Sequence, residues 1–309
     1  MDQLSNHPLY RRHNIDTAMN SLWDFYKKNF LVLFLTSFVI ALGIQYGTSL
    51  LNLQDLQSTT DPLLLLEKVK EFLVPMLILS LVSLLFSAVL QYYIIYKPLD
   101  TEINIFSSAL KSLRYFIPYI IIMVLLAVFG TIAIALGFIA LVIGMFFAAI
   151  YVMTIFLFVL PVMMVEGPDI LNTIRRTFTL THKNFWSNIG WVAVFLIIMI
   201  VISVIFSAII MIPFSGSFLK TLTNPEAAAE VVNYASNPIF IMLSAIVSAL
   251  TMPLMPILGC ILYFHGRATE DIQNLIREET KADNDRVKVE DLYAKPYSDD
   301  HPDNPDSKM

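Results

Sequence analysis

The sequence predicts an all-α, polytopic membrane protein with six transmembrane helices and three interfacial amphipathic helices. Of its 309 residues, 57% are apolar and 15% are charged, and the mean hydropathy is +0.68. A soluble domain is nearer 25% charged. The apolar residues also gather into runs of about 20, the length that crosses the hydrocarbon core of a bilayer. This composition excludes a chain built from one or two soluble domains.

The number of spans depends on one long apolar run. From Phe116 to Val165 there is no charged residue, and a single helix of that length would extend about 75 Å across a core of about 30 Å. The run is therefore expected to fold back once near Gly137, giving the third and fourth spans. In order, the expected spans are 30–51, 72–96, two within 116–165, 185–212 and 238–264.

The charged residues predict the orientation and the domain limits. Lysine and arginine gather before the first span, in 97–115, in 166–184 and after the sixth span. By the positive-inside rule both termini are expected in the cytoplasm, in a bacterial inner membrane. The polar N-terminus has no cleavage site, so the first span is expected to be an uncleaved anchor. The expected parts are a cytoplasmic segment with an amphipathic helix at 1–29, a six-span domain at 30–264, and an acidic, mostly disordered tail at 265–309.

The stretch 160–186, LPVMMVEGPDILNTIRRTFTLTHKNFW, predicts an interfacial helix between two spans. Glu166-Gly167-Pro168-Asp169 ends the preceding apolar run, and Pro168 and Asp169 suit the first turn of a new helix. At 100° per residue the following side chains separate into two arcs. The apolar arc holds Ile170, Leu171, Ile174, Phe178 and Phe185; the polar arc holds Asn172, Arg175, Arg176, Thr179 and Lys183.

Similar patterns precede the first and third spans, which suggests a threefold repeat of an elbow helix followed by a helical hairpin. The first elbow has its apolar face at Ile15, Ala18, Met19, Leu22 and Tyr26, with a break at Asn29-Phe30; the second has Ile103, Phe106, Leu110, Leu113 and Ile117, with a break at Tyr115-Phe116. The alternative is a chance similarity between helices that all lie beside a membrane surface. The loop before the sixth span is also expected to hold a short helix capped by Asn224.

Several short motifs resemble the membrane domain of bacterial glycerophosphodiester phosphodiesterases and similar stand-alone multi-pass membrane proteins. They are Pro161, Glu166-Gly167, Thr173-Ile174-Arg175-Arg176-Thr177, Asn184-Phe185-Trp186, and Tyr263-Phe264-His265-Gly266-Arg267, where His265 stands in place of an aspartate. The resemblance implies the six-span layout with interfacial helices. It brings no activity, since the membrane domain of that family has no agreed one. The catalytic barrel of those enzymes, which would need about 250 soluble residues, is not expected in this sequence.

Composition argues against catalysis. The expected spans contain no aspartate, glutamate, lysine, arginine or histidine, whereas proton relays and ion sites place such groups in the membrane interior. The five histidines are scattered, the one cysteine is Cys260, and no glycine-rich phosphate loop is present. The chain is therefore expected not to be an enzyme and to bind no metal or cofactor.

Two sets of residues are candidate binding groups. The first would contact lipid headgroups and consists of Arg175, Arg176, Lys183, Lys111, Arg114, Lys27 and Lys28. The alternative for the two arginines of 166–184 is pairing with Glu166, Asp169 or the acidic tail inside the protein. The second is a polar stripe on one face of the second span, Ser80, Ser83, Ser87 and Gln91. It would line a small polar path or contact a lipid headgroup, and the alternative is ordinary helix packing. Glu166 is expected to cap the next helix rather than bind a partner. Pro253 and Pro256 are expected to kink the sixth span, the alternative being the broken helix of a transporter.

The expected function is non-enzymatic: a multi-pass inner-membrane module of envelope homeostasis that binds a lipid or a partner protein. The alternative is a transporter or lipid translocator for a small or amphipathic substrate. The expected partners are membrane lipids, above all anionic phospholipids, with a membrane-protein partner or self-association left open and no nucleic acid. A changed lipid distribution between leaflets would favour the alternative, and a stable copurifying partner would favour the module.

Overall fold

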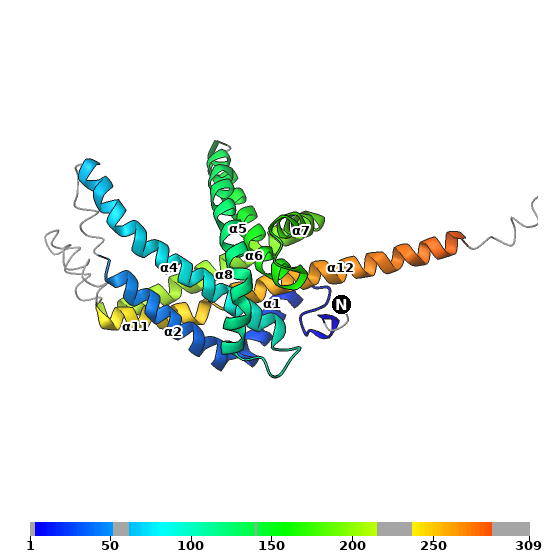
Figure 1. Ribbon diagram of the computed structural model, residues 1–309, viewed down its shortest axis with the longest axis horizontal. Helices are drawn as coiled ribbons and strands as arrows, with labels where there is room; N and C mark the ends of the chain where they lie inside the picture. The colour runs from blue at the N-terminus through cyan, green and yellow to red at the C-terminus, as the bar shows by residue number, and fades with distance from the viewer. Residues whose placement is uncertain (1–3, 52–61, 140, 215–236, 286–309) are drawn as a thin grey trace, which may run out of the picture. The chain divides into compact units, whose positions relative to one another are not determined.

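A computed structural model describes residues 4–51, 62–139, 141–214 and 237–285, and within these ranges the regular elements are helices without any strand (Figure 1). They form two compact units, Met1–Ala268 and Thr269–Met309. The helix expected at Asn224 and the tail beyond Asp285 lie outside the described residues. The helices are α1 (Ile15–Lys28), α2 (Phe30–Ser49), α4 (Pro62–Tyr96), α5 (Ile105–Ile139), α6 (Leu141–Glu166), α7 (Ile170–Lys183), α8 (Phe185–Met211), α11 (Pro238–Thr251) and α12 (Leu254–Asp285), with 3-10 turns η1 (Leu4–Asn6) and η2 (Ile212–Phe214).

Six segments in the described part of the chain are long and apolar enough to cross a membrane, which confirms the predicted all-α class and number of spans. They lie at Phe30–Ser49, Leu66–Tyr96, Ile105–Ile139, Val142–Glu166, Phe185–Met211 and Pro238–Lys281. Helix α5 ends at Ile139 and α6 begins at Leu141, so the third and fourth spans are separated just after the predicted point. Gly137 instead lies inside α5, where an added Cβ would stand 2.6 Å from the carbonyl oxygen of Gly144. That glycine allows α5 and α6 to approach closely.

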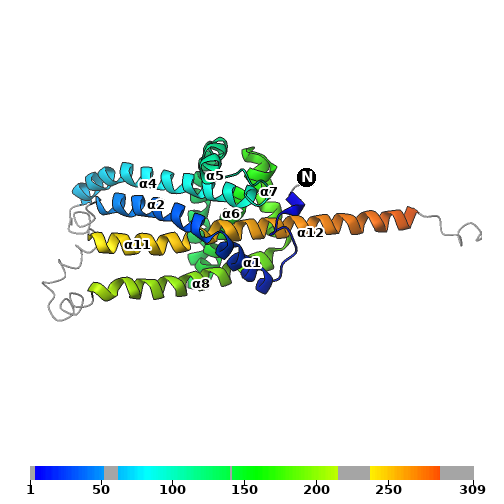
Figure 2. The ribbon, with the colours of Figure 1, turned by 90° about the horizontal axis from the view of Figure 1, so that it is seen from below.

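Helix α6 is the centre of the first unit and contacts α4, α5, α7 and α8. Helix α2 contacts both α4 and α11, and α11 contacts α8, so these four helices form a row (Figure 2). The hydrophobic core draws side chains from most of these helices. Those from α4, α6 and α12 that are almost fully buried are Leu90, Ile94, Ile95, Phe158, Met163, Met164, Tyr263 and Phe264.

Two of the three expected elbow helices are separate from the spans that follow them. Helix α1 ends before Asn29, and α7 ends before Asn184, and each asparagine lies outside the helical conformation. The second elbow is different, because α5 continues without a break from Ile105 to Ile139. No asparagine stands at Tyr115-Phe116 to end the helix, and Tyr115 is fully buried. The expectation of a separate second elbow is therefore wrong.

The first turns of α1, α5 and α7 nevertheless share one register. Each begins after a side chain that accepts a hydrogen bond from the backbone three residues later: Asn14, Asn104 and Asp169. The positions four, eight and eleven residues after that cap are buried in all three helices, and they are Ala18, Leu22 and Phe25; Ser108, Ser112 and Tyr115; and Thr173, Thr177 and Leu180. The same face of each helix therefore packs on the bundle.

The sixth span is interrupted for two residues at its prolines. Helix α11 ends at Thr251 and α12 begins at Leu254, while Met252 between them keeps an α-helical backbone conformation, which agrees with the expected proline kink. Pro253 and Pro256 both lack an N–H, which removes two donors from successive turns. The hydroxyl of Tyr26 donates to the carbonyl of Leu250 at 3.0 Å, so α1 is hydrogen-bonded to the end of α11, next to the interruption.

Histidines attach the N-terminal segment to the bundle, which the scattered positions in the sequence did not predict. His7 accepts a hydrogen bond from the N–H of Leu9 at Nδ1 and faces the carbonyl of Ile94 through Nε2 at 3.2 Å. Burial lowers the pKa of His7 to about 4, so the neutral ring is the form that fits. The backbone N–H of His13 donates to Nδ1 of His265 at 2.9 Å. The segment before α1 is thereby tied to α4 and α12.

Candidate functional site

The turn between α6 and α7 places the first group of the candidate site. Gly167 has φ 115°, a left-handed conformation that favours glycine, and its N–H donates to the carbonyl of Met163 at 3.1 Å. Asp169 then caps α7, with its side chain accepting from the N–H of Asn172 at 2.6 Å. The expectation that Glu166 caps this helix is wrong, because Asp169 already does so. Glu166, the last residue of α6, is left to point elsewhere.

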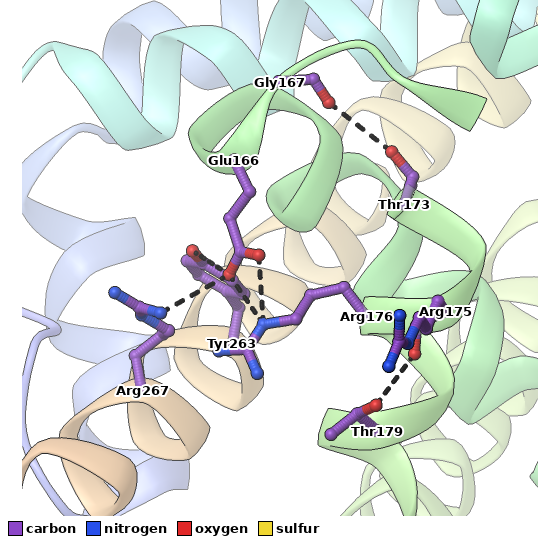
Figure 3. A network of polar contacts seen from close by, with 8 residues as sticks. All are labelled: Glu166, Gly167, Thr173, Arg175, Arg176, Thr179, Tyr263 and Arg267. Carbon is purple, nitrogen blue, oxygen red and sulfur yellow. Dashed lines mark hydrogen bonds and ion pairs between the residues drawn. The ribbon is translucent and has the colours of Figure 1, made fainter. Parts of the chain in front are cut away.

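Glu166 is the centre of a network that joins α6, α7 and α12 (Figure 3). Nε of Arg176 donates to both carboxylate oxygens of Glu166 at 3.0 Å, and the hydroxyl of Tyr263 donates to Oε1 at 3.1 Å. A guanidinium nitrogen of Arg267 lies 3.7 Å from the same oxygen. The motifs at Glu166-Gly167, Arg175-Arg176 and Tyr263…Arg267, far apart in sequence, therefore meet at one point.

This network fixes the α6–α7 turn by partly buried charges. The side chains of Glu166, Arg176 and Arg267 are each only about one-fifth exposed, at 19%, 19% and 20%, so their interactions are screened less than those of surface ion pairs. One carboxylate faces two guanidinium groups and the hydroxyl of Tyr263. These contacts hold the carboxylate in one position between α6, α7 and α12.

An apolar groove runs beside α7. Its volume is about 290 Å³, and its walls come from α5, α6 and α7. Ile174 and Phe178, from the predicted apolar arc of α7, line it together with Thr177. Across the groove stand Ile122, Leu125, Leu126 and Phe129 of α5 and Ile155 and Val159 of α6. The groove contains no charged side chain, and its dimensions and lining suit a hydrocarbon chain.

The structure distributes the predicted headgroup residues over three helices. Six of the seven are exposed at their positions, and they are Lys27 and Lys28 at the end of α1, Lys111 and Arg114 in α5, and Arg175 and Lys183 in α7. Arg114 also hydrogen-bonds the hydroxyl of Tyr115 and stacks 4.5 Å from its ring centre. Arg176 differs from the others, because Glu166 holds it inside the network.

Aromatic residues surround the end of α7. Nδ1 of His182 lies 2.8 Å from the carbonyl of Phe178, and its Nε2 lies 3.2 Å from the hydroxyl of Tyr151. The ring of His182 stacks on those of Phe178 and Phe185, at 5.8 and 5.7 Å between centres. Trp186 is 76% exposed. Amphipathic aromatic side chains of this kind favour the level of lipid headgroups.

Three of the four residues of the predicted polar stripe line a second cavity. Ser83, Ser87 and Gln91 bound a space of about 420 Å³ together with Ser248 and Thr251 of α11. Ser80, at the other end of the stripe, is exposed and does not line it. Nε2 of Gln91 donates to the thiol of Cys260 at 2.8 Å. The stripe therefore faces α11 and α12, the two helices of the sixth span. Sequence spacing could not identify this neighbour.

Within the described ranges, no cluster of three histidine, cysteine, aspartate or glutamate side chains is arranged to hold a metal ion. Sequence reasoning anticipated the residues of the Glu166 network as separate motifs and gave the pairing of an arginine with Glu166 as an alternative, which is correct for Arg176. It did not anticipate that Tyr263 and Arg267 join them. The available signal was chemical, because a lone glutamate at the end of an apolar span needs a cation, and the nearest in the sequence are Arg175 and Arg176.

Comparison with known families agrees with this arrangement. Residues 135–288 match the model of the membrane domain of glycerophosphoryl diester phosphodiesterase. The matched range runs from the end of α5 into the residues after α12 and contains all four members of the Glu166 network. No curated protein and no solved structure matches the chain. Together with the six apolar helices, the family match supports a multi-pass membrane location.

Proposed function

Since residues 135–288 belong to the family of the membrane domain of glycerophosphoryl diester phosphodiesterase, we propose that this multi-pass membrane protein is a non-enzymatic module that binds an anionic phospholipid along α7. One acyl chain would occupy the groove between α5, α6 and α7. The phosphate would lie against the exposed basic residues of α7. The proposal rests chiefly on one observation, that a single helix supplies both the groove wall and the cations.

The sequence of α7 supports this assignment. Arg175 directly follows Ile174 and lies within one turn of Phe178, and both of these apolar residues line the groove. Lys183 extends the basic side to the end of the helix. Helix α7 and the Glu166 network together contain four cationic side chains and two carboxylates. The cations are Arg175, Arg176, Lys183 and Arg267, and the carboxylates are Glu166 and Asp169. A local excess of positive charge attracts anionic headgroups.

The proposal that the chain is not an enzyme rests on the chemistry of the same residues. Glu166 accepts from Arg176 and Tyr263 and faces Arg267, so its oxygens are already occupied by donors. Binding therefore needs no cofactor and no covalent intermediate. The shape of the groove and the charge of α7 are sufficient for holding a lipid.

The charge pattern supports the proposed location and role. By the positive-inside rule both termini would lie in the cytoplasm of a bacterial inner membrane, and α7 would then lie on the cytoplasmic leaflet, where anionic lipids concentrate. A module with this placement would report or fix the lipid composition of the envelope. Its effect would pass to a membrane-protein partner or a second copy of the chain, and no nucleic acid is involved.

The test is retention of phosphatidylglycerol by the purified protein. The variant Arg175→Glu/Lys183→Glu reverses the two exposed charges of α7 and leaves Arg176 in its network. Each basic residue near an anionic leaflet contributes on the order of 1 kcal/mol, so retention should fall at least about tenfold. The matched control, Arg277→Glu/Lys281→Glu, makes the same charge change on the exposed part of α12. Native mass spectrometry over graded phosphatidylglycerol measures both.

Two outcomes would count against this function. Equal loss of lipid in both double variants would indicate a nonspecific effect of net charge. Unchanged retention in the α7 variant would mean that the basic residues of this helix do not bind headgroups. Because the spanning helices are unaltered, expression and thermal unfolding should stay near those of the unchanged protein, and that measurement separates lipid binding from folding.

A lipid translocator is the second candidate, and the interruption of the sixth span between α11 and α12 favours it. Helices α11 and α12 meet beside a cavity lined by Ser83, Ser87 and Thr251, and discontinuous helices mark substrate paths in transporters. Reconstituted vesicles with a fluorescent phospholipid in one leaflet test this role. Faster equilibration between leaflets would support translocation, and equilibration at the rate of empty vesicles would leave the binding module as the function.

A further inference from the structure

The cavity between α4, α6, α8 and the interrupted sixth span (α11 and α12) has both apolar and polar walls. Its volume of about 420 Å³ lies within the range of small-molecule sites. Apolar side chains, such as Leu157, Met199 and Met255, form most of the surface. The polar part comes from Ser83, Ser87, Gln91, Ser248 and Thr251. A ligand that fits these walls has a compact polar group joined to hydrocarbon.

The hydroxyl groups that face this cavity include some with no bond to the protein. Hydroxyls within helices usually donate to the carbonyl four residues earlier, as Thr131, Thr154 and Thr251 do here. Among the residues that the structure describes, the hydroxyls of Ser83, Ser87 and Ser248 make no such hydrogen bond. A polar group inside a membrane domain is costly when it lacks a partner. These three hydroxyls are therefore available to a ligand.

The charge of the walls decides the class of ligand. No aspartate, glutamate, lysine, arginine or histidine lines the cavity. A phosphate or an ammonium group moved into such a site would lose its hydration without gaining a counter-ion. The ligand must therefore be uncharged. Hydroxyl and ester groups meet this condition and pair with serine and threonine hydroxyls as donors and acceptors.

The route of entry follows the polar stripe of α4. Ser80 is exposed, Ser83 and Ser87 are half-buried, and Gln91 is buried with 2% exposure. Along the helix axis this gradient covers about 16 Å. Because α4 is one of the six spans, its exposed surface faces lipid rather than water. A molecule that follows the stripe enters from the bilayer.

We propose that this cavity binds an uncharged lipid with a free hydroxyl group, of the diacylglycerol class. The glycerol hydroxyl and the ester carbonyls would pair with Ser83, Ser87 and Ser248, and the acyl chains would extend past Ser80 into the bilayer. This site is separate from the groove at α7 and requires no anionic headgroup. It therefore extends the proposed function and does not depend on it.

The test uses 1,2-dioleoylglycerol as the probe and its 3-acetyl ester as a matched ligand that lacks the hydroxyl. Binding to the protein in nanodiscs is measured by native mass spectrometry and by the shift in thermal unfolding. Dioleoylglycerol should bind about tenfold more tightly than the ester, because one or two hydrogen bonds are lost. The variant Ser83→Ala/Ser87→Ala should lose that preference, and Ser80→Ala, on the same helix outside the cavity, should keep it.

Thr251→Val gives an independent check, since it removes a lining hydroxyl from the other wall with little change of shape. Equal binding of the two glycerides to the unchanged protein would overturn the proposal. So would a preference that survives in Ser83→Ala/Ser87→Ala. A cavity that holds only water would change the thermal stability of these variants without any glyceride preference, which also contradicts the proposal. Phosphatidylglycerol retention should be unaffected by the cavity variants, so the outcome is separable from that at α7.

Discussion

Replacing Glu166 by glutamine is the sharpest perturbation of the α6–α7 turn. The change keeps the shape of the side chain and removes the charge that Arg176 and Arg267 share. At an effective dielectric constant of about 20, a charge pair at 3.0 Å attracts by about 5 kcal/mol. The desolvation of three partly buried ions cancels much of this attraction. We therefore expect Glu166→Gln to lower the free energy of unfolding by about 2–3 kcal/mol.

Thermal unfolding in detergent, followed by tryptophan fluorescence, measures this loss, which should lower the midpoint by about 5 °C. Arg176→Gln should cost less, because Glu166 keeps Arg267 at 3.7 Å and the hydroxyl of Tyr263. The double variant Glu166→Gln/Arg176→Gln should be more stable than the sum of the single losses predicts, by about 1 kcal/mol. Arg277→Gln, an exposed change on α12, serves as the control.

Two results would refute this reasoning. If Glu166→Gln shifts the midpoint no more than Arg277→Gln, the network adds nothing measurable to stability. If the two single losses are strictly additive in the double variant, Glu166 and Arg176 do not interact in the folded protein. In either case the charge excess at α7 would need another explanation.

Three further predictions concern other parts of the chain. Burial lowers the pKa of His7 from 6.5 to about 4, so the unfolded chain binds the proton more readily than the folded protein. The thermal unfolding midpoint, measured from pH 7.5 to 4.5, should therefore fall as the pH drops below 6.5. The fall should be less steep in His7→Gln. Gly259→Ala would put a Cβ 2.7 Å from the carbonyl oxygen of Leu157 and should lower the free energy of unfolding in denaturant by about 1–3 kcal/mol. Gly190→Ala, with open space around the added Cβ, should not lower it. Equal losses in the two variants would contradict the close contact at Gly259. Reporter fusions after Lys281 should give a cytoplasmic signal, and an external signal would contradict the predicted topology.

The spans were predictable because hydrocarbon length is a strong physical constraint. Every backbone polar group must be satisfied within the membrane, so a long uncharged run becomes a helix whatever its neighbours are. The ends of α1 and α7 were predictable too, because Asn29 and Asn184 end helices locally. The same reasoning failed at Tyr115, where burial against the bundle keeps α5 continuous.

The candidate site was only partly predictable. The apolar and basic residues of α7 follow from the helical period, and Ile174 and Phe178 do line a groove. The partner of Arg176 could not be derived from that period, because Glu166 lies ten residues earlier, across a turn whose geometry depends on the left-handed Gly167. Tyr263 joins from 97 residues away. Contacts of that range depend on tertiary packing, which no local pattern encodes.

The roles of the histidines were missed for the same reason. In the sequence His7, His13 and His265 have no common spacing, and nothing suggests that two of them meet. In the fold the backbone of His13 donates to His265, and His7 reaches the carbonyl of Ile94. These contacts attach the N-terminal segment to helices that lie far away in the chain.

The central claim, that α7 holds an anionic phospholipid, is tested most directly by cross-linking with a photoreactive lipid. Phosphatidylglycerol with a diazirine in one acyl chain is placed in nanodiscs with the protein, and the labelled peptides are mapped by mass spectrometry. Labels should concentrate on the groove residues Leu125, Phe129 and Phe178, and they should fall at least about tenfold in Arg175→Glu/Lys183→Glu. Labelling spread evenly over all six spans, or labelling of these residues that the charge reversal leaves unchanged, would contradict the claim.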